Sequence, residues 1–343
     1  MPDANSRIET PSIAETLRPV EAGSPVVGVH FFGTTPVFVL GEQELLFAGE
    51  RGEKRVAVHD GGILASAGNG ERIVTGGDDG KVIETTADGA HETLAADAKH
   101  RWIDHVALGP DNAVAWSAGK TAFVRARRSL KDGGEDKTFD APSTVAGLAF
   151  APKGFRLAIA HYNGVTLWFP NVQGTPERLE WKGSHLGVAY SPDGKFLITE
   201  MQEPMLHGWR LVDGKHMRMS GYSGRVRSFG WTADGKALAT SGSEQLILWP
   251  FEGKDGPMGS RPKMFAPHGH RVSMVACHPS GPIVAIGYAD GLVLLVHAND
   301  GREIVARWPS ASPVSALGWD KSGDFLAFGD ENGKAGIVAF KAA

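Results

Sequence analysis

The chain has 343 residues, 42 % of them hydrophobic and 22 % charged, which is the composition of a globular protein with a large core. Its formal net charge of −4 argues against a nucleic-acid partner, because binding a phosphate backbone requires a basic surface. The single cysteine excludes an internal disulfide, the start resembles no secretory signal, and the apolar runs are too short to span a membrane. We therefore expect a cytoplasmic protein with no membrane partner.

The N-terminal segment divides into a tail and a strand. Residues 1–14 are polar and contain two prolines, so we expect a disordered tail there and a single domain over residues 15–343. Thr16 to Val20 has the composition of a short outer strand, and Pro19 suits a sheet edge because it lacks an N–H.

A short phrase then recurs along the chain. Its clearest copy surrounds Ser-Pro-Asp-Gly at residues 191–194, where an alternating apolar strand, a polar turn and a second apolar run predict a β-hairpin. The period is about 40 residues, the length of a four-stranded propeller blade. The last turn residues of the eight copies are Thr35, Gly70, Asn112, Gly154, Gly194, Gly235, Gly281 and Gly323.

The predicted inner strands precede these turns, and the second and third strands follow them. The inner strands are Val145–Phe150, Val226–Trp231, Val272–Cys277 and Val314–Trp319. The chain ends after the third strand of its last copy, so we expect residues 16–20 to supply the missing outer strand and close the ring. The prediction is all-β: one closed β-propeller of four-stranded antiparallel blades, eight favoured, with seven as the alternative if the weak first copy lies outside the ring.

These features resemble the WD40-repeat β-propellers over residues 15–343. The resemblance rests on the Ser-Pro-Asp-Gly-type turns, on Asp78-Asp-Gly80 and Ala289-Asp-Gly291, and on tryptophan at the end of third strands. Those tryptophans are Trp168, Trp209 and Trp249. The family's Gly-His dipeptide is nearly absent: His268 stands in its place in copy seven and Tyr222 in copy six. We therefore expect the family's His-Asp-Ser-Trp network to be incomplete in every blade.

Signals for catalysis or metal binding are sparse. No nucleophile elbow, Walker loop, zinc-protease or dinucleotide motif occurs. His268, His270 and His278 are close in sequence, but with no second cysteine or fixed carboxylate we expect structural roles and no metal or cofactor. A lactonase-like hydrolase or a metal-handling protein, with a site in the central channel, remains the alternative. Its candidates on inner strands are His30, Asp104 and His105.

The resemblance implies a non-catalytic scaffold that binds a protein or peptide through the face of loops entering the inner strands. Carried over position by position, the exposed residues of this face are Trp102, Asp104, Tyr162, Arg225, Arg227 and Arg271. Tryptophan, tyrosine and arginine carry much of the energy of protein interfaces, and clustered arginines favour an acidic partner. The alternative is that these side chains only surround a solvated face. A second basic cluster, from Lys120 to Lys131, is followed by acidic residues and indicates a solvated outer hairpin. The oligomeric state is open, with a monomer as the default.

Overall fold

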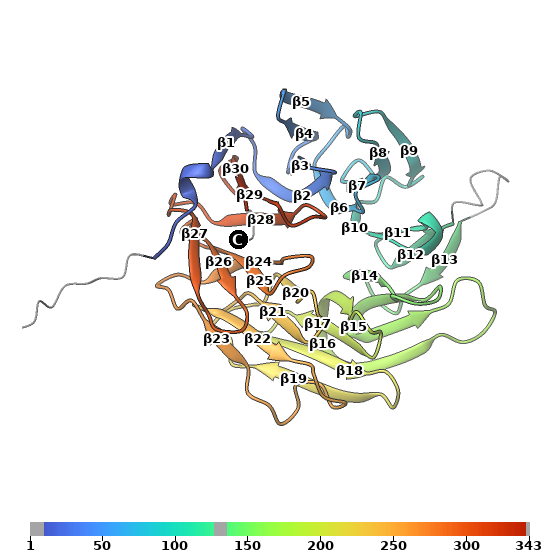
Figure 1. The fold of residues 1–343 in the computed structure, drawn as a ribbon. Coiled ribbons are helices and arrows are strands. Elements are labelled where there is room, and N and C mark those ends of the chain that lie inside the picture. Colours follow the sequence, from blue (N-terminus) through green and yellow to red (C-terminus); the bar gives the residue numbers. More distant parts are fainter. Residues whose placement is uncertain (1–9, 127–135, 341–343) are drawn as a thin grey trace, which may run out of the picture.

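The computed structural model describes residues 10–126 and 136–340, which form 30 strands arranged as a ring (Figure 1). Two short 3-10 turns, η1 (Ala14–Thr16) and η2 (Pro110–Asn112), complete the described elements. Inner strands such as β2, β6, β10, β24 and β28 lie towards the centre of the ring, and the later strands of each copy of the repeat lie progressively further out (Figure 1). The all-β propeller predicted from the sequence is confirmed.

The strands belong to seven hydrogen-bonded sheets. Six sheets have four strands each. The first three in chain order are formed by β2 (Val26–Phe32), β3 (Thr35–Leu40), β4 (Glu44–Gly49) and β5 (Gly52–Ala57); by β6 (Ile63–Gly68), β7 (Ile73–Gly77), β8 (Lys81–Thr85) and β9 (His91–Ala96); and by β10 (Ile103–Leu108), β11 (Val114–Ala118), β12 (Thr121–Arg125) and β13 (Lys137–Asp140). The other three are formed by β20 (Phe229–Trp231), β21 (Ala237–Thr240), β22 (Leu246–Pro250) and β23 (Lys263–Phe265); by β24 (Val272–Cys277), β25 (Ile283–Tyr288), β26 (Val293–His297) and β27 (Glu303–Arg307); and by β28 (Val314–Trp319), β29 (Phe325–Asp330), β30 (Lys334–Ala339) and β1 (Arg18–Glu21). The seventh has six strands: β14 (Gly147–Phe150), β15 (Leu157–Trp168), β16 (Glu177–Tyr190), β17 (Phe196–Met201), β18 (Met205–Arg210) and β19 (Lys215–Ser220).

The six-stranded sheet contains the fourth and fifth copies of the repeat. Residues 157–160 of β15 pair with β14, whereas residues 162–167 of the same strand pair with β16. Likewise, β16 pairs through residues 177–184 with β15 and through residues 185–190 with β17. The blades therefore number seven, which was the alternative, and not the favoured eight, because two copies of the repeat share this sheet. The first copy, which seven blades would have left outside, lies in the ring as β2–β5.

The N-terminal strand closes the ring as predicted. β1 pairs antiparallel with β30, with Pro19 opposite Gly336 and Val20 opposite Ala335. Because β1 is the outer strand of its sheet, the missing N–H of Pro19 leaves no ladder bond unmade. Contacts with the propeller begin before this strand among the described residues: the amide of Ile13 donates to the carbonyl of Val305 on β27 (2.9 Å). Residues 10–14 of the expected tail are therefore placed against the propeller, and residues 1–9 lie outside the described residues.

The recurring turn is stabilised by its own side chains. In the fifth copy the Ser191 hydroxyl donates to Asp193 (2.7 Å), and the same carboxylate accepts from the amide of Lys195 (3.0 Å). Gly194 has φ of 74°, a left-handed conformation that glycine adopts without strain. Thr232 and Asp234 repeat the arrangement in the sixth copy. In the first copy the turn falls at residues 33–34, so Thr35, the expected last turn residue, already begins β3.

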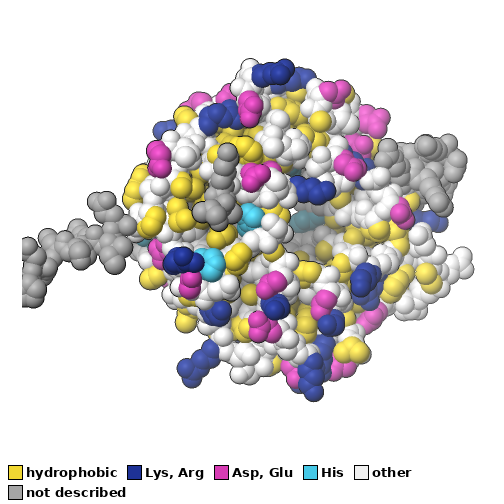
Figure 2. Space-filling view, in the orientation of Figure 1, with side chains coloured by type: hydrophobic (Ala, Val, Ile, Leu, Met, Phe, Trp, Pro, Cys, Tyr) yellow, Lys and Arg dark blue, Asp and Glu magenta, His cyan; other side chains and the backbone are white. Residues whose placement is uncertain are grey.

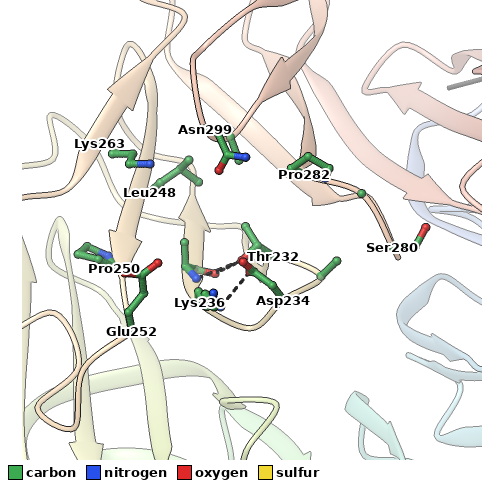
Figure 3. A pocket seen from close by; sticks show the side chains of 14 residues that line it. Thr232, Asp234, Lys236, Leu248, Pro250, Glu252, Lys263, Ser280, Pro282 and Asn299 are labelled. Atoms are coloured by element: carbon green, nitrogen blue, oxygen red, sulfur yellow. Dashed lines mark hydrogen bonds between the residues drawn. The ribbon is translucent and has the colours of Figure 1, made fainter. Parts of the chain in front are cut away.

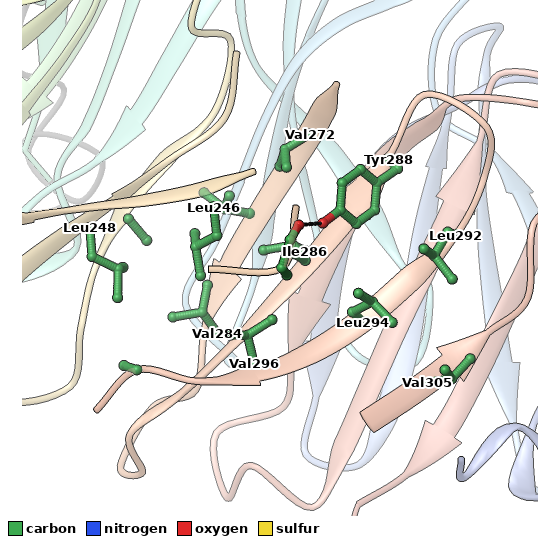
Figure 4. Close-up of a cluster of buried hydrophobic side chains, with 14 residues drawn as sticks. Leu246, Leu248, Val272, Val284, Ile286, Tyr288, Leu292, Leu294, Val296 and Val305 are labelled. Carbon is green, nitrogen blue, oxygen red and sulfur yellow. Dashed lines mark hydrogen bonds between the residues drawn. The ribbon is translucent and has the colours of Figure 1, made fainter. Parts of the chain in front are cut away.

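The core lies between neighbouring units. Leu246 and Leu248 of β22 pack against Val284 and Ile286 of the next sheet (Figure 4). Second and third strands are buried on both faces and therefore have continuous apolar sequences, whereas outer strands such as β5 are mostly exposed and polar. The apolar core therefore lies in the inner and middle strands, and the outer strands face the solvent.

Candidate protein-binding face

The predicted face is built by a repeated β-bulge. In six units the ladder between the first two strands skips one residue directly after the first residue of the inner strand. The skipped residues are Val27, Leu64, Asp104, Leu186, Ser273 and Ser315. A bulge leaves its extra residue outside the ladder and re-aims the side chain. The bulges therefore present one variable side chain per unit where the chain enters the inner strand.

The two bulged serines have structural roles. The Ser273 hydroxyl donates to the carbonyl of Val314 in the next unit (2.7 Å), and Ser315 does the same to Val26 (2.6 Å). These bonds join consecutive units around the ring. Val27 and Leu64 instead remain 48 % and 41 % exposed, so these two bulges present apolar side chains to the solvent.

The structure brings three of the six predicted residues together. Arg225, Arg227 and Arg271 line one cavity of about 300 Å3, together with Ser241, Gly242, Val272, Ser273, Ala289, Pro313 and Glu331. Trp102 and Tyr162 are 60 % and 57 % exposed, and Asp104 is partly exposed beside His105, but none of these three lines the cavity. The arginine cavity, defined by Arg225, Arg227 and Arg271, is the most compact part of the predicted face.

The three arginines keep their donors available. None of them forms an ion pair with another described residue, whereas Arg101, Arg125 and Arg307 each contact an aspartate. Arg225 donates only a long hydrogen bond to the side chain of Gln202 (3.5 Å), and its Nε is buried with no partner among the described residues. A guanidinium group that has no carboxylate partner within the protein can bind a carboxylate of another molecule through two parallel hydrogen bonds.

One charged residue near this cavity was missed from the sequence. Glu200 lies on β17, and burial raises the pKa of its carboxyl to about 6, although Arg225 and Arg227 act in the opposite direction. Its Oε2 has no hydrogen-bond partner among the described residues. Nothing in the local sequence Ile-Thr-Glu-Met marks this glutamate, because its surroundings are set by strand pairing and by the next unit.

The family network is present in part. His268 binds Asp290 (2.8 Å), and Tyr222 replaces the histidine by accepting from Trp249 Nε1 (2.7 Å) and pairing with Thr240. A third case was overlooked: His59 binds Asp79 (3.0 Å) and Thr75 (2.8 Å). The sequence signal for this histidine was its position four residues before Ile63, the first residue of the inner strand β6, which is where the family has its histidine.

Two of the histidines considered for metal or channel chemistry, His278 and His30, form hydrogen bonds within the propeller. His278 binds the carbonyl of Gly323 (3.1 Å) and accepts from the amide of Gly281, while burial raises the pKa of the Cys277 thiol to about 12. His30 contacts Ser66 (2.9 Å), and burial lowers its pKa to about 4. Within residues 10–126 and 136–340, no group of three metal-ligating side chains is found.

Other surfaces carry ordinary roles. A cavity between the sixth and seventh copies is lined by turn residues, and its Asp234 is already bound to Thr232 and Lys236 (Figure 3). Arg125 of the second basic cluster pairs with Asp136 (2.6 Å), while residues 127–135 of that cluster lie outside the described residues. On the face seen in Figure 2, basic and acidic side chains are intermixed around a central hollow. No helix in the described part of the chain is long and apolar enough to cross a membrane.

Comparison with a solved structure supports the β-propeller fold. A ring of antiparallel sheets, most of them four-stranded, that is closed by an N-terminal strand defines a β-propeller. The computationally designed Ika8 protein has the same fold: its crystal structure superposes with a TM-score of 0.73 at 16 % identity, covering 93 % of this chain and 97 % of that one.

The sequence comparison supports the WD40 resemblance. The chain is similar to WD repeat-containing protein 1-B of Xenopus laevis, with 36 % identity over 88 residues. The match covers 25 % of this chain and only 14 % of that protein. No family model matches the chain. Fold, repeat motifs and this partial match together support the resemblance to WD40-repeat propellers.

Proposed function

We propose that this propeller is a non-catalytic scaffold that binds an acidic protein partner through the face on which the bulged residues lie. The observation that carries the proposal is the arginine cavity, where three guanidinium groups converge without an ion pair to any described residue. Trp102 and Tyr162, which do not line this cavity, offer further exposed aromatic surface, and such residues contribute strongly to interfaces. A cytoplasmic location, proposed from the sequence, is compatible with the single reduced cysteine.

The test is capture of a partner by variants of this face. Tagged wild-type protein and the triple variant W102A/R225A/R227A are compared in extracts of the native host, with bound proteins identified by mass spectrometry. We expect a partner recovered with the wild type to be reduced at least about tenfold with the triple variant, because hot-spot residues of these types are each worth about 2 kcal/mol.

The control must remove equal charge elsewhere. Arg178 and Arg218 lie on outer strands β16 and β19, so R178A/R218A changes the net charge without touching the arginine cavity. We expect it to recover the partner like the wild type. Equal recovery by the wild type and the triple variant would show that the partner binds another surface.

A further inference from the structure

Arg271 reaches from the seventh copy of the repeat back to the sixth. The position that a Cβ atom would take on Gly224 lies 3.1 Å from Cζ of Arg271, and such an atom would collide with the Nη1 of the same guanidinium. Gly224 directly precedes Arg225 in the chain. The guanidinium of Arg271 therefore lies over the backbone beside Arg225, and this close approach depends on the absence of a side chain at position 224.

The backbone beneath these arginines is fixed by hydrogen bonds between the two copies. The amide of Gly224 donates to the carbonyl of Gly242 (2.9 Å), and the amide of Gly242 donates to the carbonyl of Val272 (3.0 Å). Gly242 and Val272 both line the arginine cavity. Arg225 and Arg271 are thus carried on one continuous backbone platform, which sets the spacing of their side chains.

The part of the cavity formed by the eighth copy carries the opposite charge. Pro313 and Glu331 line it there, and the amide of Glu331 donates to the carbonyl of Pro313 (3.2 Å). Glu331 is exposed and forms no ion pair with another described residue. Arg225 and Arg227 belong to the sixth copy and Arg271 to the seventh. The cavity is therefore basic towards the sixth copy and acidic towards the eighth.

The size and the charges of the cavity restrict what can enter it. Its volume of about 300 Å3 is at the lower end of ligand sites and gives room for one or two side chains. A purely acidic segment would place negative charge beside Glu331 as well as beside the arginines, and like charges across an interface repel. A segment with a basic residue next to its acidic residue matches both ends of the cavity.

We propose that the arginine cavity is a dipolar site for a partner segment with an acidic side chain beside a basic one: Arg225, Arg227 and Arg271 hold the carboxylate, and Glu331 holds the cation. This inference rests on the proposed function and names the chemistry of the segment that enters the cavity. The arginines supply most of the affinity, because guanidinium groups bind carboxylates through paired hydrogen bonds. Glu331 supplies selectivity, since an exposed ion pair changes affinity only about two- to fivefold.

The experiment uses three fluorescein-labelled peptides in which Gly-Ser repeats flank a centre of Asp-Asp-Lys-Lys, Asp-Asp-Ser-Ser or Ser-Ser-Lys-Lys. Fluorescence anisotropy at low salt measures their affinity for the full chain. The wild type should bind the Asp-Asp-Lys-Lys peptide about two- to fivefold tighter than the Asp-Asp-Ser-Ser peptide. E331Q should lose this preference and E331K should reverse it. R225A/R227A should bind both peptides at least about tenfold more weakly than the wild type.

Two glycine variants test the geometry without changing any charge. G224A places a methyl group where the guanidinium of Arg271 lies, so it should weaken binding of the Asp-Asp-Lys-Lys peptide about three- to tenfold. Gly269 stands two residues before Arg271, and a Cβ atom on it would meet no atom within 4 Å. G269A is therefore the matched control, and we expect it to bind like the wild type.

The outcomes separate the two proposals. If E331Q keeps the preference for the Asp-Asp-Lys-Lys peptide while R225A/R227A loses binding, the dipolar site is wrong and the acidic-partner surface stands. Equal affinity of G224A and G269A would overturn the assignment of Arg271 to the site. Absent binding, equal binding of the Ser-Ser-Lys-Lys peptide, or binding insensitive to R225A/R227A would overturn both proposals. Thermal melts of E331Q and G224A should match those of the wild type, which shows that an altered affinity does not come from unfolding.

Discussion

Acid should destabilise this propeller in part through one buried histidine, His207. His207 of β18 is fully buried, and its ring stacks on Trp181 (ring centroids 4.3 Å apart) and on His216 (5.5 Å). Neither ring nitrogen has a hydrogen-bond partner among the described residues. Burial lowers the pKa of His207 to about 3, with smaller contributions from the charges of His185 and His216.

The size of the effect follows from linkage. In the unfolded chain a histidine has a pKa of about 6.5, so the unfolded state binds a proton more readily than the folded state. The stability due to neutral His207 is therefore complete above pH 6.5 and is lost as the pH falls towards 3. At pH 5 the free energy of unfolding should be lower by about 2 kcal/mol than at pH 7.5, and at pH 4 by about 3 kcal/mol.

The assay is urea unfolding of wild type and H207F at pH 7.5, 6 and 5, followed by tryptophan fluorescence. Phenylalanine keeps an aromatic ring against Trp181 and removes the titrating group, so H207F should lose this part of the acid sensitivity. It should match or exceed the wild type at pH 7.5, because two unpartnered nitrogens are removed. H216F, which alters the exposed neighbour, should keep the wild-type pH dependence. An unchanged pH dependence in H207F would refute the reasoning.

Three further changes test the closure and the buried polar groups of the ring. R307M should lower the free energy of unfolding by about 3 to 5 kcal/mol, because it leaves the fully buried Asp330 without its partner, and R307M/D330N should recover part of that loss in thermal melts. Y222F removes the hydroxyl that accepts from Trp249, and chemical denaturation should give a loss of about 1 to 3 kcal/mol, with no loss if the hydroxyl is dispensable. V20D places a charge at the buried face of β1, so size-exclusion chromatography should find a partly opened or aggregated protein, and an unchanged monomer would contradict closure by this strand.

The elements that sequence analysis located best are those fixed by neighbouring residues. β24 and β28 begin and end where predicted, because alternation and the turn are local properties. Closure by β1 was also predictable, since the last copy lacked one strand. That two copies share one sheet could not be predicted, because it depends on how β15 and β16 continue through their turns.

The candidate site was predictable as a set of positions and not as a set of contacts. The sequence placed Arg225, Arg227 and Arg271 at equivalent points of consecutive units, and the ring converts those points into one cavity. Whether a position serves the fold or a partner depends on what it touches across units. Ser273 occupies the same bulge as Asp104, yet its hydroxyl is used by the backbone of the next unit.

Glu200 is a residue that the sequence analysis missed because its surroundings depend on contacts across the sheet. A glutamate within an apolar strand is unremarkable in sequence, and it becomes informative only when strand register aligns it with Gly76, Gly287 and Gly329. Burying a carboxyl at that step costs free energy that a small residue would not. The charges of Arg225 and Arg227 offset part of that cost, because they act on the pKa of Glu200 in the direction opposite to burial.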